Sequence, residues 1–128
     1  DIGVTGVQTC ALPISGPVAP GTAKLLDDDD ALLKAVAVGA ALGHHTAYTW
    51  LKVPASRDPA RMLSCTTLPA LILGGAPGPD PEATYASWER AMKVPNVRGL
   101  VVGRALLYPA DGDVHAAIDR AARIVRPG

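Results

Sequence analysis

Three short apolar runs, each closed by a proline or a glycine, most constrain how this chain can fold. The runs are residues 48–53 (YTWLKV), 68–73 (LPALIL) and 100–102 (LVV), followed by Pro54, Gly74-Gly75 and Gly103-Arg104. Their β-branched and large apolar side chains predict strands. Because the runs are continuous and do not alternate apolar with polar residues, they favour strands buried on both faces of a parallel sheet.

Two Asp-Pro pairs predict where helices begin between these strands. Asp58-Pro59 and Asp80-Pro81 each place a capping carboxylate before a proline at the first helical position. The helix after Asp80 has a predicted core face made of Tyr85, Trp88 and Met92.

Two further helices are predicted at the ends of this pattern. Four aspartates at 27–30 form a solvated cap before ALLKAVAVGAALG, which predicts a helix that ends at Gly43. A last helix, from about 113 to 125, has a predicted apolar face of Val114, Ala117, Ile118, Ala121 and Val125. The order is therefore one helix and then strand-helix three times, an α/β class built from right-handed βαβ units. A barrel and an open doubly wound sheet both remain compatible with this order.

Length, charge and cysteine content exclude several classes of protein. The 128 residues allow one small domain or part of a larger one. With 12 basic and 12 acidic side chains, no nucleic-acid or membrane-surface partner is expected. No apolar run approaches the roughly 20 residues that span a bilayer, so we expect a cytoplasmic protein. The only cysteines, Cys10 and Cys65, are too few for a cysteine-based zinc site; Cys65 is predicted to be an apolar filler, and no metal is expected.

Residues 1–16, DIGVTGVQTCALPISG, differ in character from the rest of the chain. They have no helical or strand periodicity and no charge after Asp1. The run VTGVQTCALPI resembles the conceptual translation of a common sequencing adapter. We therefore expect a non-native extension at 1–16, with residues 17–128 as a piece of a longer protein. The alternative is an irregular N-terminal arm.

The candidate site lies where three successive predicted strands end. Lys52, Gly74-Gly75 and Gly103-Arg104 occupy these ends, which in parallel α/β folds share the edge where active sites form. Glycine lets backbone N–H groups approach phosphate oxygens closely, and arginine supplies a fork of donors. The two glycine pairs and Arg104 are therefore predicted to bind a substrate phosphate.

Lys52 is the candidate catalytic residue because it lies in an otherwise apolar strand. Desolvation makes an amine nucleophilic near neutral pH, so that it can form a Schiff base with a carbonyl compound. The alternative is a lysine that extends to solvent or pairs with an acid.

YTWLKVP, LPALILGG and VRGLVVGRALLYP, in this order and spacing, resemble the closing part of class I aldolase barrels of the DeoC/LacD and archaeal-type fructose-bisphosphate aldolase group. The likeness is to an actinobacterial subfamily. It implies a partial TIM (β/α)8 barrel, consisting of the last three strand-helix units and a preceding helix. It also implies a lyase in carbohydrate metabolism without a cofactor, in which Lys52 forms the Schiff base with a phosphorylated sugar or related keto compound. The longer protein is expected to form homo-oligomers.

Two alternatives to an active aldolase remain open at this point. One is a barrel that binds phosphate or flavin mononucleotide without imine chemistry, with Lys52 as a counter-charge. No G-x-G-x-x-G follows any strand, which argues against a dinucleotide-binding fold. The second alternative to an active aldolase is that the truncated chain is inactive, because the acids and tyrosines for proton transfer lie on strands it lacks.

Overall fold

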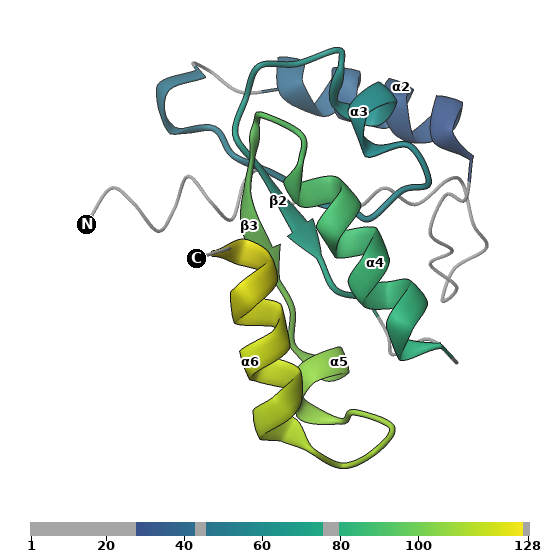
Figure 1. The fold of residues 1–128 in the computed structure, drawn as a ribbon. Coiled ribbons are helices and arrows are strands. Elements are labelled where there is room, and N and C mark those ends of the chain that lie inside the picture. Colours follow the sequence, from purple (N-terminus) through teal and green to yellow (C-terminus); the bar gives the residue numbers. More distant parts are fainter. Residues whose placement is uncertain (1–27, 43–45, 76–79, 127–128) are drawn as a thin grey trace, which may run out of the picture.

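The computed structural model describes residues 28–42, 46–75 and 80–126, which form a three-stranded sheet and its helices (Figure 1). The strands are β1 (Leu51–Pro54), β2 (Ala70–Leu73) and β3 (Val97–Val101). The α-helices are α2 (Asp29–Ala41), α3 (Pro59–Leu63), α4 (Pro81–Met92), α5 (Arg104–Leu107) and α6 (Val114–Val125), and a 3₁₀-helix, η1, spans Thr46–Tyr48. Residues 1–16, Gly43 and their predicted roles lie outside the described residues.

The three strands pair in parallel and in chain order, β1-β2-β3, as predicted. The predicted strand boundaries are less accurate than the pairing. Tyr48 belongs to η1, and β3 begins at Val97, three residues before the apolar run. The α/β class is thereby confirmed as a small parallel sheet with helices.

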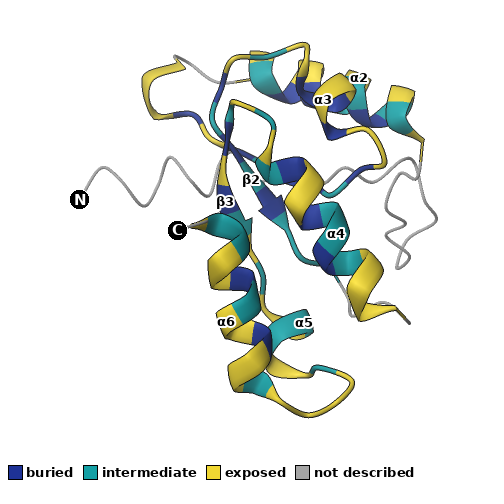
Figure 2. Cartoon of the chain, viewed as in Figure 1, coloured by how far each residue is buried: buried dark blue, intermediate teal, exposed yellow. Residues whose placement is uncertain are grey.

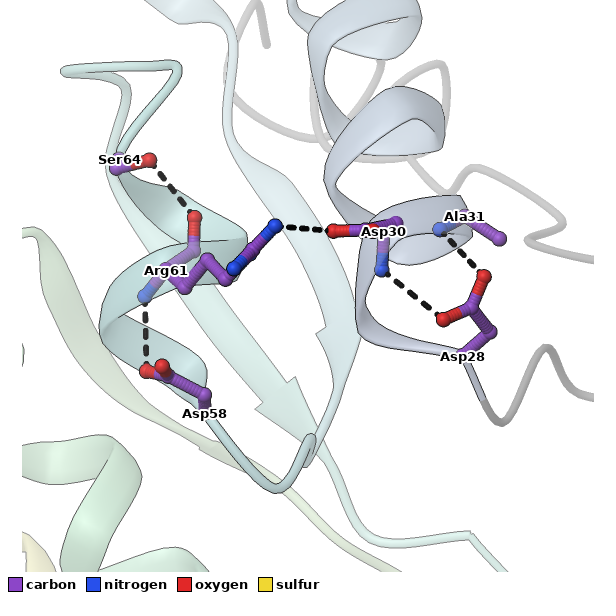
Figure 3. Close-up of polar contacts among 6 residues, drawn as sticks. All are labelled: Asp28, Asp30, Ala31, Asp58, Arg61 and Ser64. Carbon is purple, nitrogen blue, oxygen red and sulfur yellow. Dashed lines mark hydrogen bonds and ion pairs between the residues drawn. The ribbon is translucent and has the colours of Figure 1, made fainter.

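Four aspartates cap four of the helices. The side chains of Asp28, Asp58, Asp80 and Asp113 accept hydrogen bonds from backbone N–H groups in the first turns of α2, α3, α4 and α6. Figure 3 shows the first two caps, together with the 2.5 Å ion pair in which Arg61 on α3 reaches Asp30 on α2. The predicted Asp-Pro helix starts and the solvated aspartate cap are confirmed.

One face of the sheet is buried against the helices. Leu51, Val53, Ala70 and Ile72 are at most 1% exposed. They form one apolar cluster with side chains from four helices: Leu32 and Val36 of α2, Met62 and Leu63 of α3, Tyr85, Trp88 and Ala91 of α4, and Ala121 of α6. Figure 2 shows these buried positions along β2 and on the adjoining side of α4. The aromatic stripe of α4 is confirmed as core packing, whereas Ile118 of the predicted α6 face is exposed.

The opposite face of the sheet is much less shielded. Because side chains alternate along a strand, Lys52, Leu71, Leu73 and Val101 lie on the face away from the apolar cluster. The first three are half-buried and Val101 is 41% exposed. The expectation that both faces are buried is therefore wrong within the described residues, because helices of this part of the chain cover one face. We call this second surface the open face.

No helix in the described part of the chain is long and apolar enough to cross a membrane.

An ion pair joins α4 to α6 on the outside of the fold. The Arg120 guanidinium donates two hydrogen bonds to the Glu82 carboxylate, one of them 2.5 Å long from Nη2 to Oε2. It also lies over the Tyr85 ring, 4.2 Å from the ring centroid. The hydrogen bonds from Arg120 hold the pKa of Glu82 below its ordinary value of 4.5, against a smaller effect of desolvation.

Glu82→Gln should lower the Tm modestly at neutral pH, and its effect should shrink as the solution is acidified. A carboxylate with a depressed pKa in the folded state stabilises the fold above its ordinary pKa, and this stabilisation is lost as the pH falls through the folded-state pKa. Thermal melts from pH 7 to pH 3 would measure the difference, with Asp119→Asn on α6 as the control. A Glu82→Gln deficit that does not shrink as the pH falls from 7 to 3 would contradict this account of the ion pair.

Candidate functional site

The carboxyl ends of the three strands are level with one another. Pro54 of β1 pairs with Leu73 of β2, which pairs with Val101 of β3. The β2–β3 ladder continues one residue further, since the Gly74 N–H donates to the Val101 carbonyl at 3.1 Å. The predicted phosphate-binding residues, Gly74, Gly75, Gly103 and Arg104, therefore follow two adjacent strands at one edge of the sheet, which we call the rim.

Lys52 lies below the rim. It is the second residue of β1 and pairs with Leu71, two residues before the paired strand ends. At about 3.3 Å per residue, its backbone is roughly 7 Å from those ends along the strand direction. The structure thus places Lys52 within the open face and not at the strand end that the sequence analysis assigned to it.

Close packing accounts for glycine at position 74. A Cβ there would lie 3.0 Å from the Cβ of Val102 and closer still to its Cγ1. Carbon atoms of different side chains do not pack at these distances. A residue larger than glycine would therefore push β2 and β3 apart.

Backbone conformation accounts for glycine at position 75. Gly75 has a φ of +64°, in the left-handed region that glycine adopts without strain. A Cβ at Gly75 or at Gly103 would meet no atom of the described residues within 4 Å. These residues therefore leave open space beside the backbone at both of these rim positions.

A short helix that the sequence analysis missed begins at the rim. α5 follows Gly103, which has no side chain to cap it, and starts with the exposed Arg104. The available signal was the helix-favouring run Arg-Ala-Leu-Leu before Pro109, but a single turn is too short for periodicity to reveal.

Ser56, just beyond β1, was also missed. Its side chain is buried, and its hydroxyl oxygen has no hydrogen-bond partner among the described residues. Buried hydroxyls are nearly always hydrogen-bonded, so this one requires an explanation. The sequence around a single serine after a strand does not indicate that its hydroxyl will be buried without a hydrogen-bond partner.

The other candidate residues do not assemble into a site. Among residues 28–42, 46–75 and 80–126, no three His, Cys, Asp or Glu side chains gather to hold a metal ion. Cys65 is exposed and not an apolar filler; its thiol lies 3.7 Å from the Leu33 carbonyl and 3.6 Å from that of Met62.

Comparison with known proteins identifies the family. A family model described as Cgl0159-like matches residues 5–122, which is nearly the whole chain. The chain belongs to the Cgl0159-like family. The match begins inside residues 1–16, and the adapter origin of that segment stays a prediction.

A solved structure agrees with the family model. The crystal structure of Cgl0159 from Corynebacterium glutamicum matches with a TM-score of 0.77 and 49% sequence identity, over 85% of this chain. The match covers 36% of the Cgl0159 chain, so this chain spans little more than a third of that protein's length. The comparison with curated proteins finds no match.

These findings overturn the resemblance to class I aldolases. The chain matches the Cgl0159-like family, and nothing in the comparisons points to a DeoC-type or other Schiff-base aldolase. The glycines that carried the resemblance are required by close packing at Gly74 and by a positive φ at Gly75, which are general demands of tight strand ends. The predicted lyase activity and the Schiff base on Lys52 are therefore withdrawn.

Gly74→Ala should destabilise the fold by about 1–3 kcal/mol, because the added methyl overlaps Val102. The matched control is Gly103→Ala, which meets open space and should change stability by less than about 0.5 kcal/mol. Chemical denaturation would measure both. In a Val102→Ala background the cost of Gly74→Ala should shrink, and an unchanged cost would show that the contact with Val102 is not responsible.

Proposed function

We propose that this chain is part of a parallel β/α barrel, and that the rim of its sheet binds a small phosphorylated ligand. The observation that carries the proposal is the level pairing of the β2 and β3 ends, which brings two glycine turns and Arg104 to one edge.

The asymmetry of the sheet supports a barrel. Parallel strands are ordinarily covered on both faces, and a barrel achieves this when its inner faces pack against one another. Here the helices cover one face only, and the open face presents apolar side chains such as Leu71 and Leu73 around Lys52. An open doubly wound sheet would need further helices on that face.

The length of the matched protein also fits a barrel. Because 85% of this 128-residue chain corresponds to 36% of the Cgl0159 chain, the latter has about 300 residues. A (β/α)8 barrel typically needs about 250 residues. Three strand-helix units are three eighths of an eight-unit barrel, which is close to the 36% of the Cgl0159 chain that the match covers.

The rim has the components of a phosphate site. In many barrels, phosphate binds to the loops after the last two strands and beside a short extra helix. β2 and β3 are adjacent parallel strands here, and α5 is a short additional helix directly after β3. Open space beside Gly75 and Gly103 lets phosphate oxygens approach the backbone, and the exposed Arg104 supplies the positive charge.

Lys52 has a different role in this proposal from the one first predicted. It lies on the face that a closed barrel would turn inward, below the rim. Its ammonium group there adds positive potential beneath the anionic ligand without forming a covalent bond.

Arg104→Gln should weaken the binding of inorganic phosphate about tenfold, since a charge-assisted hydrogen bond contributes roughly 1.5–3 kcal/mol. The matched control is Arg98→Gln, which removes an exposed arginine near the amino end of β3. Isothermal titration at constant ionic strength would measure both affinities. If the two variants lost phosphate affinity equally, the loss would be explained by the change in net charge. That result would contradict a site at the rim.

The open face should cause this chain to associate with itself, because apolar side chains and the outer edges of β1 and β3 are left without partners by the described residues. Val101→Lys places a charge on that face and should shift the chain toward the monomer. Val38→Lys, at a 53% exposed position on α2, should not. Size-exclusion chromatography with light scattering would measure this. A wild-type chain that is a monodisperse monomer with a cooperative melt would contradict the barrel proposal.

A further inference from the structure

We propose that Lys52 binds a carboxylate at the far end of the ligand whose phosphate occupies the rim. The ligand is then a phosphorylated carboxylic acid, with its two anionic groups at opposite ends of a short carbon chain. This inference rests on the proposed function and names the class of ligand that the site takes.

The first observation is that Lys52 is a half-buried cation without an anionic partner. Within the described residues its side chain makes no hydrogen bond or ion pair, whereas Arg61 and Arg120 each pair with a carboxylate. The three strands, LKVP, ALIL and VRGLV, contain no aspartate or glutamate. An ammonium group on an apolar surface is costly unless an anion offsets its charge.

Strand pairing leaves room beside Lys52 on the open face. Lys52 pairs with Leu71, which pairs with Gly99. Gly99 has no side chain, and a Cβ there would meet only Leu71 among the described residues, at 3.7 Å. The lysine ammonium lies at the end of a flexible four-carbon stem, so it can move over Leu71 toward this space. The row therefore offers a cation with room beside it for a small anionic group.

The same register sets the spacing between the two anionic groups. Lys52 and Leu71 lie two residues before the paired strand ends, which is about 7 Å at about 3.3 Å per residue. The rim glycines follow those ends. A chain of about six carbons, with bonds of about 1.5 Å, is long enough to join the two positions.

The charge of Lys52 favours a carboxylate over a second phosphate. One ammonium group balances the single charge of a carboxylate, but a phosphate ester carries about −1.5 to −2 at neutral pH. The excess charge would lie among Leu71, Leu73 and Val101, the apolar side chains of the open face. The rim suits the more highly charged group better, because it combines Arg104 with open space beside two glycine backbones.

Isothermal titration with two matched probes tests the inference. The probes are 6-phosphogluconate and glucitol 6-phosphate, which share one carbon chain and one phosphate and differ in a carboxylate or a hydroxymethyl group at the far end. The wild-type chain should bind 6-phosphogluconate about tenfold more tightly, because a charge-assisted hydrogen bond to the carboxylate is added. In Lys52→Met, which keeps the length of the side chain without its charge, this preference should disappear.

Two controls show that the loss in Lys52→Met is specific. The variant should still bind glucitol 6-phosphate within about twofold of the wild type, and its Tm without ligand should not fall, because no partner in the described part of the chain is lost. Lys34→Met removes the same charge from an exposed position on α2 and should keep the preference for 6-phosphogluconate.

The outcomes separate this inference from the function on which it rests. If the wild type binds both probes equally, the carboxylate assignment is wrong and the rim site stands. A preference that persists in Lys52→Met, or that is lost equally in Lys34→Met, would also overturn the role of Lys52. Tighter binding of glucitol 1,6-bisphosphate than of 6-phosphogluconate would make the second group a phosphate and contradict the proposed ligand class. If the wild-type chain binds neither 6-phosphogluconate nor glucitol 6-phosphate, both proposals fail.

Discussion

The fold depends on burying one face of three short parallel strands. Parallel pairing requires the chain to cross back between strands, and right-handed crossovers place every connecting helix on the same side. Val53 and Ile72, at the centre of that face, are completely shielded from solvent. The helices that shield them begin at aspartate caps that the local sequence supplies. Substitutions that weaken this cluster would therefore disturb both the sheet and the rim that it positions.

The open face and the rim follow from the same arrangement. Helices on one side leave Lys52 and Val101 on the other, where no helix of the described residues covers them. Parallel strands also bring all their carboxyl ends to a single edge, so the residues after each strand become neighbours although they are far apart in sequence. The ends of β1, β2 and β3 meet in this way. Strand register, and not any one sequence motif, brings the turns after these strands to the same edge.

Local features of the fold could be predicted from the sequence, and features set by tertiary contacts could not. The Asp-Pro helix starts at Asp58 and Asp80 depend on neighbouring residues alone, and they are confirmed. The start of β3 depends on pairing, since the Ala70 N–H donates to the Asn96 carbonyl at 2.8 Å, before the apolar run begins. The aldolase assignment failed because glycines at strand ends also satisfy packing and backbone conformation, and so do not identify a reaction.

Amide chemical-shift mapping by heteronuclear NMR tests the central claim most directly, because it locates a bound anion on the sheet without assuming which residues bind it. The account predicts that inorganic phosphate shifts the backbone amides of Gly75 and Gly103 at the carboxyl edge. Amides at the opposite edge, such as those of Ala70 and Val97, should not shift. Shifts centred on the amino edge, or scattered among surface arginines with none at the rim, would contradict it.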